Sequence, residues 1–120
     1  MRRRNLSDRT RLLHMRDACR RALEIAQGKN LRSLAPEEET SLALVRLLEI
    51  LGEAARGVSE DLKRLHPEVP WREIVATRNL LIHEYFGVDM EVVAAIVEQD
   101  LPSLLERLEG LLAALDEPGR

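Results

Sequence analysis

The stretch LPSLLERLEGLLAAL, residues 101–115, decides the fold class, because its leucines repeat with the period of an α-helix. Steps of three and four residues place the leucines on one face, as in a helix with one buried side. The residues on this face are Leu101, Leu104, Leu105, Leu108, Leu111, Leu112 and Leu115. Pro102 stands at the start of the run, where we expect it to break or kink the preceding helix.

The same helical period runs through the rest of the chain. Ser7 or Asp8 is expected to cap the first helix, and Asp89 the last. Pro36, followed by carboxylates, suits the first turn of the second helix. The expected helices span about 8–27, 36–57, 59–65, 70–87 and 90–115, the last one interrupted at Pro102.

No strand pattern or repeat accompanies these helices, so we expect an all-α antiparallel helix bundle with four main helices and short ones between them. Residues 1–120 are expected to form a single domain, with residues 1–6 as a flexible basic N-terminus. The apolar stripes are broader than one small bundle needs. A two-fold homodimer through one helix face is therefore expected.

Composition limits the location of the protein. Cys19 is the only cysteine, so no intramolecular disulfide can form, which fits a reducing compartment. The N-terminal MRRRNL lacks the apolar segment of a signal peptide, and no apolar run approaches the roughly 20 residues of a membrane span. We expect a cytoplasmic protein without a membrane partner.

Charge is distributed unevenly along the chain. Residues 1–32 carry ten basic side chains and three acidic ones, whereas the remaining 88 residues carry eight basic and eighteen acidic ones. This asymmetry favours a surface suited to phosphates or to an acidic partner. A solvated helix face with a basic terminus explains it equally well.

The segment RNLLIHEYFGVD, residues 78–89, places polar side chains in an otherwise apolar stretch. Arg78 interrupts an apolar helix face, which is costly unless its guanidinium is paired, reaches solvent or has a function. Arg78 and His83 are five residues apart, about 140° around a helix, whereas Asn79 and His83 share a face. To act on one substrate, Arg78 must wrap around the helix, the helix must loosen near Gly87, or two subunits must combine their residues.

A purely structural interpretation of the segment is also open. Arg78 can pair with Glu53 across the bundle, His83 can cap the helix and Tyr85 can lie in the core. Glu53 belongs to a polar stripe with Arg46, Glu49 and Arg56, which favours a solvated face, so we keep it as a support for the site only. No cluster has the spacing of metal ligands, and we interpret the isolated His14 and His66 as structural.

The motif Arg78-Asn79-x-x-x-His83-x-Tyr85 resembles the Arg-x4-His-x-Tyr signature of HEPN-domain proteins, specifically the HepT-like toxins of minimal-nucleotidyltransferase toxin–antitoxin pairs. The resemblance extends through LLHMRDA (12–18), LVRLLEILGEAARGVSEDL (44–62), HPEVPWREIVATRN (66–79) and HEYFGVDMEVV (83–93). Leu80 departs from it, because relatives often carry a basic residue there.

The resemblance implies a HEPN-like dimer acting as a metal-independent endoribonuclease toxin that needs no cofactor. Arg78 and His83 are its implied catalytic residues, because RNA supplies its own 2′-OH nucleophile and needs a proton-transfer group and a cation. Asn79 is expected to orient the phosphate or His83. Tyr85 is the implied position at which a nucleotidyltransferase antitoxin attaches AMP and silences the toxin.

Two other function classes are compatible with the same residues. One is a non-catalytic, nucleotide-binding partner subunit of a nucleotidyltransferase, in which Arg78 and His83 contact nucleotide phosphates. The other is a structural dimerisation protein, which is favoured if replacement of His83 changes stability but no activity.

Overall fold

All regular elements of the described residues are helices, which confirms the predicted all-α fold. The computed structural model describes residues 6–81 and 87–117, and of Arg78 it describes the backbone. The elements are α1 (Asp8–Ala26), η1 (Leu31–Ser33), α2 (Glu39–Gly57), α3 (Glu60–Leu65), α4 (Trp71–Leu81), α5 (Met90–Ala95), η2 (Ile96–Asp100) and α6 (Leu101–Leu115).

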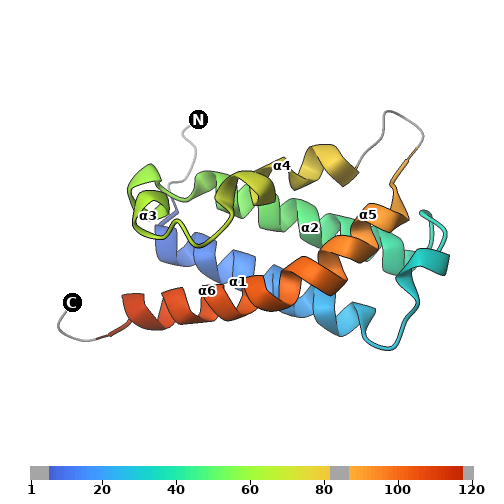
Figure 1. The fold of residues 1–120 in the computed structure, drawn as a ribbon, viewed down its shortest axis with the longest axis horizontal. Helices are drawn as coiled ribbons and strands as arrows, with labels where there is room; N and C mark the ends of the chain where they lie inside the picture. The colour runs from blue at the N-terminus through green and yellow to red at the C-terminus, as the bar shows by residue number, and fades with distance from the viewer. Residues whose placement is uncertain (1–5, 82–86, 118–120) are drawn as a thin grey trace.

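The long helices form an antiparallel bundle (Figure 1). α1 packs against α2 and α6, and α2 packs on its other side against α4. Successive neighbours in the order α4, α2, α1, α6 run in opposite directions (Figure 1). This arrangement confirms the predicted antiparallel helix bundle.

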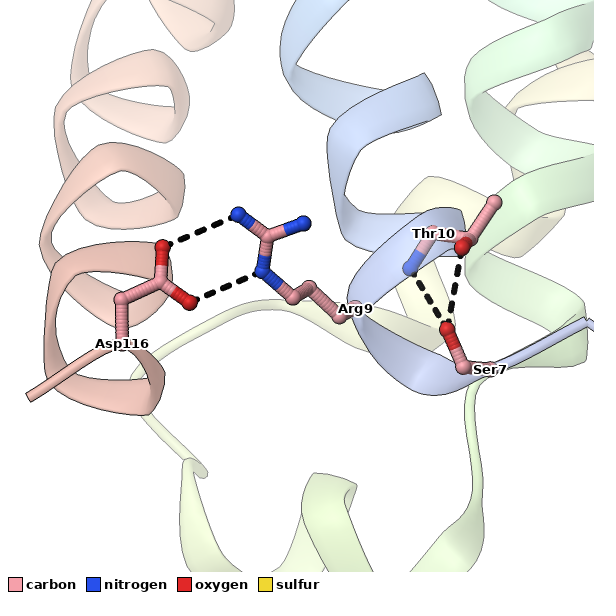
Figure 2. Close-up of polar contacts among 4 residues, drawn as sticks. All are labelled: Ser7, Arg9, Thr10 and Asp116. Atoms are coloured by element: carbon pink, nitrogen blue, oxygen red, sulfur yellow. Dashed lines mark hydrogen bonds and ion pairs between the residues drawn. The ribbon is translucent and has the colours of Figure 1, made fainter. Parts of the chain in front are cut away.

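The first helix begins and ends where its sequence signals predict. The Ser7 side chain caps α1 by accepting a hydrogen bond of 3.1 Å from the backbone N–H of Thr10 (Figure 2). At the other end Gly28 has a φ of 75°, a left-handed conformation that glycine adopts without strain and that turns the chain away from α1.

The second helix begins at Glu39, three residues later than expected. The segment before it forms a turn held by side chains instead. The Glu38 carboxylate accepts a hydrogen bond of 2.6 Å from the backbone N–H of Ala35, and the buried Ser41 hydroxyl donates one of 2.7 Å to the Ala35 carbonyl. Pro36 therefore lies in this turn and not in the first turn of α2.

The chain stays helical through Pro102, so of the expected break or kink the break does not occur. A π-helical turn, η2, lies directly between α5 and α6, and Pro102 occupies the first turn of α6. Proline has no backbone N–H and its ring displaces the carbonyl of the preceding turn. A wider turn with one extra residue makes room for that ring without ending the helix.

Among the described residues, Trp71 is the aromatic member of a largely aliphatic core. Leu12, Met15, Leu44, Leu48 and other residues of the predicted stripes are buried, together with Cys19 and Trp71. The stripes contain exceptions, because Leu115 remains 43% exposed at the end of α6. Within the described ranges, no helix combines the length and apolarity needed to cross a membrane.

Polar contacts hold the ends of the bundle together. The Arg9 guanidinium donates two hydrogen bonds, of 2.8 and 3.0 Å, to the Asp116 carboxylate and so links the start of α1 to the end of α6 (Figure 2). The Asp8 carboxylate accepts hydrogen bonds from the backbone N–H and the hydroxyl of Ser59, at 2.9 and 2.6 Å. The same Ser59 hydroxyl caps α3.

Candidate functional site

Helix α4 carries the first half of the candidate motif and lies very close to α2. Gly52 of α2 makes this approach possible, because a β-carbon there would lie 3.2 Å from the backbone oxygen of Ile74 and 3.8 Å from that of Val75. Gly52 is buried at this crossing. The absence of a side chain at Gly52 therefore fixes how closely α4, which carries Arg78, sits against α2.

The antiparallel register places the described start of the motif, Arg78 and Asn79, along the middle of α2. Gly52 lies opposite Ile74, so Arg78, four residues later on α4, is about 6 Å further along and level with Leu48. Asn79 follows on α4 with an exposed side chain. Glu53 is also exposed, as its polar stripe predicts, but lies about 8 Å along α2 from the level of Arg78.

The structure brings together only part of the predicted site. Arg78 and Asn79 share the last two turns of α4, and Glu53 lies on the neighbouring helix. His83 and Tyr85 fall outside the described residues. The helix predicted to run to Gly87 is described as far as Leu81.

A cleft of about 880 Å³ lies between α1 and α2. Its lining is rich in charged and ring nitrogen groups: Arg11 and His14 from α1, and Arg46 and Arg56 from α2. Glu49 and Glu53 lie on the same wall. His14 is exposed in this cleft, so the apolar stripe of α1 does not include it.

Two arginines of the cleft, Arg11 and Arg56, have no counter-ion among the described residues. Across residues 6–81 and 87–117, no hydrogen bond or ion pair engages the side chains of Arg11, Arg56 or Arg72. Other arginines in the same ranges pair with carboxylates: Arg9, Arg16, Arg20, Arg21, Arg32, Arg46 and Arg64. The pairing of Arg46 with Glu49 is long, at 3.5 Å, and Arg46 is 70% exposed.

Arg11 is held in a constrained position. Its guanidinium lies directly over Gly57, where any β-carbon would collide with it. Gly57 is the last residue of α2, and a cation is favoured near the C-terminal end of a helix. The Arg11 Nε is buried without a hydrogen-bond acceptor, which costs about 1–3 kcal/mol.

A second hollow of about 340 Å³ separates α4 from η2 and α6. Its walls are largely apolar, with Ile74 and Leu80 on one side and Ile96 and Leu104 on the other. Thr77 lies in this wall, and its hydroxyl is satisfied by donating a 3.0 Å hydrogen bond to the Glu73 carbonyl. The Thr77 hydroxyl is therefore not available to bind a ligand in this largely apolar hollow.

An arginine clamp holds the segment that follows the motif. The Arg32 guanidinium contacts Glu91 of α5 at 2.9 Å and Glu98 of η2 at 2.7 Å. These hydrogen bonds raise the pKa of Arg32 above its usual value, with Glu98 contributing most. The clamp ties η1 to the helix that begins directly after Asp89.

The remaining reactive groups have structural roles in the described part of the chain. Burial raises the pKa of the Cys19 thiol to about 12, which disfavours its reactive thiolate form. His66 lies 3.2 Å from Glu68, and its backbone carbonyl accepts a hydrogen bond from the Trp71 indole. No three His, Cys, Asp or Glu residues of the described ranges are grouped as metal ligands.

Sequence reasoning missed that Arg11 of α1 and Arg56 of α2 line the same cleft. The basic excess of residues 1–32 pointed to such a surface, but it did not distinguish Arg11 from its neighbours. The signal was Gly57, a helix-terminal glycine that leaves room for a long side chain from another helix.

The chain is similar to known ribonuclease sequences. Residues 15–111 match the family model described as ribonuclease HepT-like. A protein of Thermococcus cleftensis named "Probable ribonuclease HepT" is 49% identical over 75 residues, which are 62% of this chain and 68% of that protein. No solved structure matches the chain.

Two further relatives carry RNase names. A protein of Methanocaldococcus jannaschii named as a candidate RNase is 45% identical over 67 residues, covering 56% of this chain and 62% of that protein. A protein of Caldanaerobacter subterraneus, also named as a candidate RNase, is 32% identical over 101 residues, covering 84% of this chain and 90% of its own length.

Proposed function

The chain belongs to the HepT-like ribonuclease family, and on this basis we propose that it is an endoribonuclease that uses Arg78 and His83. The observation that carries the proposal is the extent of the family match, because residues 15–111 include the whole motif from Arg78 to Tyr85. α4 packs closely against α2 at Gly52, and its last turn is exposed at Asn79 and Leu80. Such a helix can hold catalytic side chains in place at the surface.

The proposed chemistry uses the nucleophile that RNA itself carries. The 2′-oxygen attacks the adjacent phosphorus, its proton passes to a base, and the bond from phosphorus to the 5′-oxygen breaks as that oxygen gains a proton. A histidine titrates near neutrality and suits these proton transfers, the proposed role of His83. Arg78 supplies a permanent, fork-shaped cation for the charge that develops on the phosphate. Asn79 and Glu53 are proposed as supporting polar groups.

The test compares matched variants on the same helix. His83→Ala and Arg78→Ala are expected to lose RNA cleavage while keeping the helical circular-dichroism spectrum, and Arg78→Lys is expected to recover little. Arg72→Ala removes an unpaired arginine from the exposed side of α4 and is expected to cleave normally. Cleavage is expected to persist in EDTA. Full activity in folded His83→Ala protein would refute the mechanism, and nucleotide binding without cleavage would favour the non-catalytic partner subunit.

We also propose that the active form is a two-fold dimer with its cleft between the two copies. Leu42 of α2 and Leu80 of α4 support this, because they are 57% and 53% exposed on the helix that carries Arg78 and on the helix that packs against it. Exposed leucines on adjacent elements are typical of a surface that another chain covers. Light scattering is expected to give about twice the chain mass of 13.7 kDa.

The dimer has a matched pair of tests. Leu42→Glu is expected to give a monomer, whereas Leu65→Glu, on the 75% exposed Leu65 of α3, is expected to leave the mass unchanged. Mixing inactive Arg78→Ala and His83→Ala proteins is expected to restore about a quarter of the activity if each site combines residues of both chains. A fully active monomer would refute the shared cleft.

We propose further that the protein is a toxin paired with a nucleotidyltransferase antitoxin that attaches AMP to Tyr85. A phosphodiester charge and a purine beside Arg78 and His83 would oppose an RNA phosphate by charge and by volume. Expression with the partner and ATP is expected to raise the mass by one or more AMP units. Tyr85→Phe is expected to keep nuclease activity and to escape silencing. Silencing of Tyr85→Phe by AMP transfer would refute this role.

A further inference from the structure

The α1–α2 cleft contains cationic groups that the fold does not use. Arg11 and Arg56 line it without a hydrogen bond or ion pair to any other described residue. Surface arginines elsewhere on the described bundle are mostly paired, for example Arg20 with Glu109 and Arg9 with Asp116. Unpaired arginines on both walls of one cleft mark a place where an anion would gain contacts that the protein itself does not provide.

The structure also holds the Arg11 guanidinium in a defined position in this cleft. Gly57 leaves the space that its guanidinium occupies, and its Nε is buried without an acceptor. Buried polar groups in proteins almost always have a partner, so an unsatisfied one beside an open cleft points to a partner that binds there. The planar guanidinium presents its N–H donors as a fork, and this fork matches the oxygens of a phosphate.

The cleft follows α2 toward the candidate motif. Arg56 and Arg46 are ten residues apart on α2, which is about 15 Å along the helix axis. The register set by Gly52 places Arg78 level with Leu48, which is two residues from Arg46 along α2. An extended strand that contacts Arg56 and Arg11 at one end therefore reaches the level of Arg78 at the other.

We propose that the α1–α2 cleft binds phosphates of the RNA substrate, with Arg11 and Arg56 as its main contacts and Arg46 at the end nearer the motif. This substrate-binding track rests on the proposed ribonuclease function. Single-stranded nucleic acid is commonly held by a groove with cations along the backbone path. Glu49 and Glu53 line the same cleft, so the arginines and these carboxylates share one surface.

The track is tested with RNA that the protein cannot cleave. A single-stranded RNA with a 2′-O-methyl group at every position is titrated by fluorescence anisotropy at several salt concentrations. The slope of log affinity against log salt is expected to fall in magnitude by about 1.4 for Arg11→Gln/Arg56→Gln, since each phosphate contact on a single strand contributes about 0.7. Arg72→Gln, at the third unpaired arginine, removes a charge outside the cleft and is expected to leave the slope unchanged.

Gly57→Ala gives a second test that keeps every charge. Its β-carbon displaces the Arg11 guanidinium, so the slope is expected to fall in magnitude by about 0.7 without loss of thermal stability. An unchanged salt slope in both cleft variants overturns the track. A fall in the slope for Arg72→Gln as large as that for the cleft variants also overturns it, because RNA would then be attracted by the overall charge of the surface and not by this cleft. Binding of a glutamate-rich peptide through these arginines in place of RNA also overturns it.

Cleavage of ordinary RNA separates the track from the proposed function. Wild-type protein that cleaves RNA, with cleft variants of unchanged affinity, would refute the track alone. Wild-type protein that binds the methylated RNA through the cleft yet cleaves no RNA would refute the ribonuclease function alone.

Discussion

Replacement of Gly52 by alanine tests the contact that positions α4. A β-carbon at residue 52 would lie 3.2 Å from the Ile74 backbone oxygen, closer than ordinary van der Waals contact. That oxygen belongs to the hydrogen-bonded interior of α4, so relief requires the whole helix to move. Gly52→Ala is therefore expected to push away the helix that carries Arg78.

The magnitude follows from a comparison with Gly110 on α6. A β-carbon at Gly110 would meet nothing within 4 Å, and the residue is exposed. Either change to alanine gains about 0.5–1 kcal/mol from helix propensity. Gly52→Ala also incurs the cost of overpacking, about 1–3 kcal/mol. For a chain of 120 residues, 1 kcal/mol corresponds to a Tm shift of about 4 °C.

The assay is thermal unfolding of the two variants followed by circular dichroism. Gly110→Ala is expected to raise the Tm by about 2–4 °C, and Gly52→Ala to melt about 4–12 °C below Gly110→Ala. Gly52→Ala is also expected to cleave RNA more slowly, whereas Gly110→Ala is expected to cleave at the wild-type rate. Equal stabilisation by the two substitutions would show that α2 and α4 do not approach each other closely at Gly52.

Two ionisable groups give further predictions. Cys19, with a thiol pKa of about 12, is expected to resist a thiol reagent such as Ellman's reagent in native protein and to react fully in denaturant; rapid native reaction would contradict its burial. Arg9 holds the pKa of the Asp116 carboxyl below its usual value by hydrogen bonding. The contact between Arg9 and Asp116 therefore stabilises the fold fully above the unfolded pKa of the carboxyl, about 4, and this stabilisation is lost as pH falls through the lower folded pKa. Asp116→Asn is expected to weaken the dependence of Tm on pH below about 4, and an unchanged acid limb would refute this role.

Much of the fold could be predicted from the sequence, because helix signals are local. The period of the leucines, the Ser7 cap and the stop at Gly28 each depend on neighbouring residues, and each is confirmed. The start of α2 was predicted too early at Pro36. There the competing turn depends on side-chain hydrogen bonds from Glu38 and Ser41, which proline and acidic composition do not reveal.

The candidate catalytic residues were identified by sequence alone, because the motif from Arg78 to Tyr85 is contiguous and resembles a known family. Only the tertiary structure decided which distant residues share a surface. The periodic pattern of apolar residues does not reveal what lies against a glycine. The structure shows that Gly52 leaves room for α4 and that Gly57 leaves room for the Arg11 side chain. Those contacts join residues far apart in the chain, and their positions depend on how whole helices pack.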